Sequence, residues 1–201
     1  MACRRDDGVA DAVIVGGRPK RACETGDVEF TLERSKALLT RTPASLSALL
    51  EGLPEEWTMS DEGPGTWSPY QVVGHMVHIE ESDWIDRTRT ILVEGEARNF
   101  EPIDREAGFS RFAGWPMTEL LDRFRAVRAS NLAELDSVVS ADDLGRIGIH
   151  PTFGDVTLGQ LLATWVVHDL NHLDQITKTM AKQYKEAIGP WREFLPIVDA
   201  P

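Results

Sequence analysis

Four stretches of this chain place apolar residues three and four positions apart, the spacing that builds one face of an α-helix. They cover residues 31–52, 68–93, 118–139 and 157–180, and no stretch has the pattern of a parallel sheet. Each such helix must bury its apolar face against a neighbour, and four of them in sequence favour one bundle. The sequence therefore predicts an all-α fold, a four-helix bundle.

The helix boundaries are marked by capping residues. Ser68 is followed by Pro69 and by Gln71, and Thr157 is followed by Gln160, so both starts have the spacing of a capping box. In the first stretch, Thr42-Pro43 indicates either a kink or a new helix start. The first stretch is therefore one helix or a pair of helices.

The remaining segments set the domain boundaries. Residues 1–27 are rich in charged and small residues and are predicted to form a flexible tail, which leaves residues 28–201 as one bundle domain. Cys3 and Cys23 lie in that tail, outside every periodic stretch, and are interpreted as reduced bystanders. Residues 95–116 form a long connection, which is interpreted as a lid, a crossover or a cover for the bundle end. Residues 150–154 form a turn.

Composition excludes two kinds of partner. The formal net charge is −12, and phosphate backbones are bound by clustered Lys and Arg, so no nucleic-acid partner is expected. No apolar run approaches the roughly 20 residues that cross a bilayer, so no membrane contact is expected either. The expected location is cytoplasmic.

Histidines in two of the predicted helices indicate a metal site. His168 and His172 are four residues apart, so both imidazoles stand on one helix face, in the row that begins with Trp165. His75 shares the apolar stripe of the second helix and is preferred to its neighbour His78 as a third ligand. The alternative for the pair is ordinary core packing. Three buried imidazoles leave several nitrogens to satisfy, however, and one divalent metal would satisfy three together.

The carboxylates near these histidines have two interpretations. Most of the acidic residues after His78 are expected to form a solvated face, although one could orient an imidazole or act as a base; they are Glu80, Glu81, Asp83 and Asp86. Asp169 is interpreted as a surface carboxylate, or one that supports a ligand, in preference to a ligand itself. No catalytic residue is assigned.

Several motifs together resemble a known family, the DinB-like superfamily, which includes YfiT-like metal-dependent hydrolases. The resemblance spans about residues 30–183, and it rests on Trp67-Ser68-Pro69, Val72-Val73-Gly74-His75-Met76 with Glu80, Gly154-Asp155-Val156-Thr157-Leu158, His168-Asp169-Leu170-Asn171-His172 and Gln175-Ile176. It implies an up-down-down-up four-helix bundle, frequently a homodimer. It also implies a divalent metal held by three histidines, which fall here on His75, His168 and His172.

Two classes of function follow. In the first, the chain is a metal-dependent hydrolase or thiol S-transferase acting on a small molecule, with zinc or nickel as the metal and a low-molecular-weight thiol as cosubstrate; the resemblance implies the thiol chemistry. Phe109, Phe112 and Trp115 of the long connection would then shield the substrate. In the second, the chain is a non-catalytic metal-binding or stress-related interaction protein. A phosphohydrolase of the His-Asp type is a minor alternative that rests only on His168-Asp169.

Overall fold

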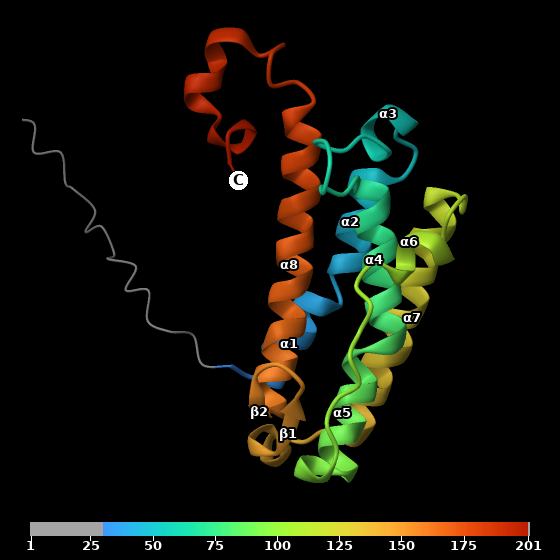
Figure 1. Cartoon of the computed structure of the whole chain (residues 1–201), viewed down its shortest axis with the longest axis vertical. Helices are drawn as coiled ribbons and strands as arrows, with labels where there is room; N and C mark the ends of the chain where they lie inside the picture. Colours follow the sequence, from blue (N-terminus) through green and yellow to red (C-terminus); the bar gives the residue numbers. More distant parts are fainter. Residues whose placement is uncertain (1–29, 201) are drawn as a thin grey trace, which may run out of the picture.

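The computed structural model describes residues 30–200, and these form a four-helix bundle (Figure 1). The predicted tail over residues 1–27 and both cysteines lie outside the described residues. The α-helices are α1 (Leu32–Leu39), α2 (Thr42–Leu50), α3 (Glu55–Thr58), α4 (Pro69–Ser82), α5 (Trp84–Val93), α6 (Ala107–Arg111), α7 (Met117–Val138) and α8 (Leu158–Lys182). Two strands, β1 (Ile147–His150) and β2 (Gly154–Thr157), and short 3₁₀ turns η1 (Gly95–Ala97), η2 (Ala141–Gly145), η3 (Gly189–Phe194) and η4 (Pro196–Val198) complete the order.

The bundle has the up-down-down-up order that the family resemblance implies (Figure 1). The α1–α2 pair runs up the bundle, α4–α5 and α7 both run down, and α8 returns along its full length. The first stretch is thus a pair of helices, with Pro43 in the first turn of α2. In the described part of the chain, no helix is both long and apolar enough to cross a membrane.

Capping boxes start the two helices that carry the predicted ligands. The side chain of Ser68 accepts a hydrogen bond from the backbone N–H of Gln71, and the side chain of Gln71 accepts one from the backbone N–H of Ser68. Thr157 and Gln160 form the same pair of hydrogen bonds at the start of α8. These starts are confirmed at the residues that the sequence indicated. They set where each histidine lies along its helix.

The second predicted helix is not continuous, and the expectation of one helix from 68 to 93 was wrong in this respect. Asp83 has φ −127° and ψ −68°, outside the helical region, and separates α4 from α5. Its side chain is buried and pairs with Arg87 at 2.5 Å. Three consecutive residues at the break are buried: Asp83, Trp84 and Ile85. The side of the helix that faces the core is therefore different before and after the break. Hydrophobic spacing alone does not reveal this local change.

The predicted turn at residues 150–154 joins an antiparallel hairpin, β1 paired with β2, at the lower end of the bundle (Figure 1). These strands were missed because four residues are too few to show an alternating pattern. The connection over residues 95–116 contains η1 and the helix α6. Its first part runs alongside the bundle before α6 packs on α4 (Figure 1).

Candidate metal centre

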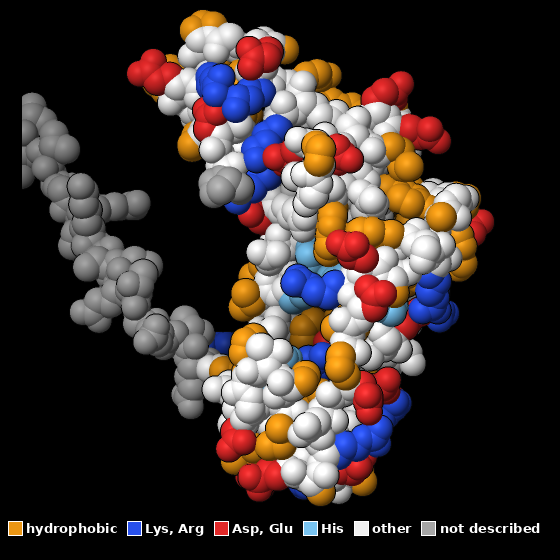
Figure 2. Space-filling view, viewed as in Figure 1, with side chains coloured by type: hydrophobic (Ala, Val, Ile, Leu, Met, Phe, Trp, Pro, Cys, Tyr) orange, Lys and Arg blue, Asp and Glu red, His pale blue; other side chains and the backbone are white. Residues whose placement is uncertain are grey.

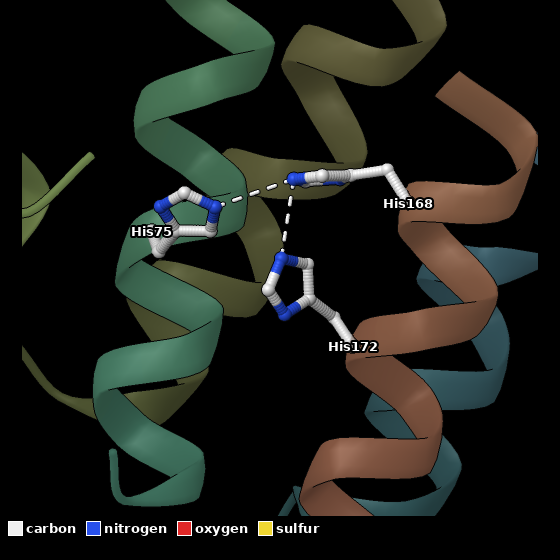
Figure 3. Close-up of side chains that lie close together, drawn as sticks. All are labelled: His75, His168 and His172. Atoms are coloured by element: carbon white, nitrogen blue, oxygen red, sulfur yellow. Dashed lines mark hydrogen bonds between the residues drawn. The ribbon is translucent and has the colours of Figure 1, made fainter. Parts of the chain in front are cut away.

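Three histidines meet between α4 and α8, in the middle of the bundle (Figure 3). His75 projects from α4, whereas His168 and His172 stand one turn apart on α8. The Nε2 atoms of His75 and His172 lie 3.2 Å and 3.1 Å from the Nε2 atom of His168. One ligand atom from each ring lies within 4.8 Å of the others. The structure therefore brings together the three residues that the sequence proposed as ligands.

The outer nitrogens of two rings are held by hydrogen bonds. The Nδ1 atom of His75 lies 2.7 Å from the carbonyl oxygen of Arg105, and that of His172 lies 2.8 Å from Oε1 of Gln175. Both partners are acceptors, so each Nδ1 carries the proton and donates it. The Nε2 atoms of both rings are then unprotonated and turn their lone pairs toward the centre of the cluster.

The third ring cannot satisfy this arrangement alone. His168 approaches two Nε2 lone pairs but can offer at most one Nε2–H, and its Nδ1 atom is buried with no partner in the described part of the chain. In either tautomer a buried polar group stays unsatisfied, which costs free energy. A cation shared by the three Nε2 atoms removes the conflict at the centre.

Two of the three nitrogen separations, those from His168 to the other two rings, are close to the spacing around a tetrahedral ion. A Zn–N bond of about 2.0–2.1 Å in tetrahedral geometry places two ligand nitrogens about 3.3–3.4 Å apart. The observed 3.2 Å and 3.1 Å require outward shifts of only a few tenths of an ångström. The donor set of three imidazoles suits zinc, nickel, copper or iron.

Burial keeps the three rings neutral. Removal from water lowers the pKa of His75 to about 4 and that of His168 to about 2, and it lowers the pKa of His172 as well. For His75 and His168, the neighbouring histidines add to this effect. At neutral pH each ring is therefore in the form that can ligate a metal.

His78 does not join the cluster. It lies on α4 one turn from His75 but points toward α6, where the Cβ atom of an alanine at position 108 would come within 3.1 Å of the Cβ atom of His78. His75 is almost fully buried, whereas His78 is half-buried. The geometry thus groups His75 with the α8 pair, and metal binding itself stays a prediction.

Aromatic rings line the cluster on two sides. Trp67 lies with its ring centre 5.0 Å from that of His75 and stacks over His172 at 6.3 Å, and Trp84 meets His168 edge-on at 5.2 Å. Of the three aromatic residues expected to shield a substrate, Phe109 contacts Trp67. The other two do not reach the histidines: Phe112 is buried in the core, and Trp115 lines a different groove near Tyr70.

A buried charge cluster lies about one helical turn from the histidines. Arg128 of α7 donates to Glu80 of α4 at 2.7 and 2.9 Å, to Asp169 of α8 at 2.7 and 2.9 Å, and to the carbonyl oxygen of Leu39 at 2.9 Å. All five N–H groups of the guanidinium are used. Burial raises the pKa of Glu80, and the positive charge of Arg128 opposes that rise. The cluster links α4, α7 and α8 beside the three histidines.

This cluster corrects two expectations about carboxylates. Glu80 and Asp83 do not belong to a solvated face, because both are buried, whereas Asp86 is exposed. Of the two roles expected for Asp169, the surface role was wrong, because Asp169 is buried and both its oxygens accept from Arg128. That pairing also speaks against the His-Asp phosphohydrolase alternative, which needs the aspartate as a metal ligand.

Sequence reasoning missed Arg128 and Arg105. Arg128 carried a signal: it stands four residues after Phe124 and four before Leu132, so it occupies a core position of an apolar stripe. No sequence signal pointed to Arg105, because its contact with His75 depends on where a loop meets α4.

A family model of the DinB superfamily matches residues 38–176. The chain belongs to the DinB superfamily. Among solved structures, YfiT from Bacillus subtilis, described as a probable metal-dependent hydrolase with an unusual four-helix bundle topology, superposes with a TM-score of 0.68 and is 21% identical; the match covers 79% of this chain and 92% of YfiT.

A second four-helix bundle protein, TT2238, gives a TM-score of 0.50 at 22% identity and covers 73% of this chain and 98% of its own. None of the curated proteins matches this DinB-superfamily chain. Structural similarity at 21% and 22% identity supports the fold alone.

Proposed function

We propose that this DinB-superfamily chain is a metal-dependent enzyme, a hydrolase or a thiol S-transferase, whose divalent metal is held by His75, His168 and His172. The observation that carries the proposal is the convergence of three buried Nε2 atoms, two of them unprotonated because their Nδ1 atoms donate to fixed acceptors. The description of YfiT as a probable metal-dependent hydrolase supports it. Zinc and nickel are the metals proposed.

Three protein ligands are typical of catalytic zinc sites, whereas structural zinc sites use four. When bound, such a metal lowers the pKa of a coordinated water or thiol and so supplies a nucleophile near neutral pH. Several residues around the three histidines would support a metal in this role. Arg105 and Gln175 orient two of the rings, Trp67 and Trp84 limit the access of water, and the Arg128 cluster holds α4 and α8 in register.

A small-molecule substrate would enter beside His172. There a pocket of about 610 Å³ reaches the cluster, within the volume range of ligand sites. It is lined by Glu62, Gly65, Thr66, Trp67, Arg105, Glu106, Asn171, His172, Asp174, Gln175, Lys178, Thr179 and Lys182, and this space is called the His172 pocket below.

Metal content tests the ligand assignment. Protein purified without a nickel column should contain about one divalent ion per chain, the stoichiometry of a single three-imidazole site. His75→Ala and His168→Ala should each abolish binding, whereas His78→Ala, a substitution one turn away on α4, should not. A folded protein that takes up neither zinc nor nickel would overturn the proposal, and loss of metal in His78→Ala alone would show that the wrong histidine was chosen.

A spectroscopic experiment separates the enzyme from a non-catalytic metal-binding or interaction protein. Cobalt-substituted protein should change its visible spectrum when a thiol or small anion is added, because a three-ligand site accepts another donor. Turnover of an electrophile or ester should then depend on the metal. A spectrum that no added ligand changes would favour the binding-protein alternative.

A further inference from the structure

Within the part of the chain that the structure describes, one cation of the His172 pocket, Arg105, makes no ion pair with an acidic side chain. Lys178 pairs with Asp174 at 2.8 Å, and Lys182 pairs with Glu62 at 2.6 Å. The guanidinium of Arg105 has no ion pair or hydrogen bond within residues 30–200. In Figure 2 histidine side chains reach the surface near the middle of the molecule, with a basic side chain among them.

The backbone holds Arg105 against the metal centre. Its carbonyl oxygen accepts the Nδ1–H of His75 at 2.7 Å, and the carboxylate of Asp104 accepts the backbone N–H of Glu106 at 3.0 Å. Burial is the main cause of the lowered pKa of the three histidines, and the charge of Arg105 adds to it in each case. Arg105 and His172 line the same pocket, and the side chain of Arg105 is exposed to solvent.

These observations favour an anion of a particular shape. A guanidinium offers a planar pair of N–H donors that matches a carboxylate in a bidentate pair. The ring of Trp67, which lines the same pocket and stacks over His172, provides an apolar wall for the rest of a small molecule. The ring centre of Trp67 lies 5.0 Å from that of His75 and 6.3 Å from that of His172, so one small ligand can contact both Trp67 and the cluster.

We propose that Arg105 is the anchor of a carboxylate-bearing small molecule, which pairs its carboxylate with the guanidinium while a second donor group of the same molecule reaches the three-histidine centre. This inference rests on the proposed function and names its substrate class. Glu106 is the neighbouring residue of opposite charge in the pocket lining, and it supplies a matched control.

Two probes that differ only in the carboxylate test the proposal. Cobalt-loaded protein is titrated with 3-mercaptopropionate and with 3-mercapto-1-propanol, and the dissociation constants are taken from the visible spectrum. The wild-type chain should bind the acid about 10- to 100-fold more tightly than the alcohol, the range of a charge-assisted bidentate contact. Arg105→Ala should remove this preference and leave the affinity for the alcohol unchanged. Arg105→Lys should keep part of it, and Glu106→Gln should not weaken it.

Calorimetry of the metal-free protein with the same probes distinguishes the two possible failures. Equal affinity for acid and alcohol in the wild type, no binding of either, or a preference that survives in Arg105→Ala overturns the anchor. If the spectrum still responds to both thiols, the proposed function stands without it. If the protein binds no metal but calorimetry still finds a preference that depends on Arg105, the anchor stands and the proposed function fails.

Discussion

Arg128→Met is expected to destabilise this protein most at neutral pH and progressively less, relative to the wild type, as the pH falls. The substitution removes the cation that both Glu80 and Asp169 face, and all three side chains are at most 2% exposed. Methionine keeps much of the apolar volume but none of the five N–H donors. Two carboxyl groups would then be buried without their counter-ion.

The magnitude follows from protonation. A carboxyl group with an ordinary pKa near 4 takes up a proton at pH 7 at a cost of about 4 kcal/mol, at 1.36 kcal/mol per pH unit. Removal of one partner of a buried ion pair typically costs about 3–5 kcal/mol. Protonation of one or both carboxyls therefore predicts a loss of about 4–8 kcal/mol at pH 7. That is much of the roughly 5–15 kcal/mol that stabilises a domain.

Urea unfolding followed by circular dichroism between pH 5 and pH 8 measures this change. At these two carboxyls the folded variant holds one or two more protons than its unfolded chain, while its histidines behave as they do in the wild type. The difference in the free energy of unfolding between wild type and variant should therefore shrink by about 1.4–2.7 kcal/mol for each pH unit of acidification below 7. The metal-free wild type should lose stability over the same range, because its buried histidines must remain neutral. The difference between the two proteins should be smallest near pH 5.

Arg125→Met is the matched control on the same helix. Arg125 pairs with Asp122 on the exposed face of α7, and such surface pairs contribute about 0–1 kcal/mol. Adding Glu80→Gln and Asp169→Asn to Arg128→Met should restore the pH slope of the wild type. An Arg128→Met protein with the pH slope of the wild type, or one no less stable than Arg125→Met, would refute the reasoning.

Three further predictions concern packing, capping and pH. Gly108→Ala should destabilise the fold by about 1–3 kcal/mol, since the new Cβ would lie 2.6 Å from the carbonyl oxygen of Gly74. Gly145→Ala is the control, and it should change the melting temperature little because the space around Gly145 is open. Thr157→Ala should cost about 1 kcal/mol in urea unfolding through loss of the α8 cap; Thr157→Ser should restore most of it. Because the pKa of His75 is lowered to about 4 in the folded chain, the unfolded chain binds more protons below pH 6.5. The free energy of unfolding of the metal-free protein should therefore fall between pH 6.5 and 4, by up to about 1.4 kcal/mol per pH unit from this residue. His75→Gln should make this slope shallower, and an unchanged slope would contradict the lowered pKa of His75.

The sequence by itself determined the helices and the histidine pair. Periodicity predicted the bundle, and Ser68 and Thr157 marked helix starts, because these signals depend only on residues within one or two turns. The pairing of His168 with His172 has the same local origin. The apolar stripe also favoured His75 over His78, and His75 is the ring that lies near the α8 pair, whereas its role as a ligand stays a prediction.

Only the tertiary structure decided which polar groups meet. Arg128, Glu80 and Asp169 come from three helices, and their burial depends on how those helices pack, so the carboxylates looked like surface residues in the sequence. Arg105 lies beside the three-histidine cluster because a loop 30 residues beyond His75 returns to accept a hydrogen bond from His75. Local patterns specify which face of a helix is apolar, whereas contacts between distant segments depend on the packing of the whole chain, and no short-range signal encodes them.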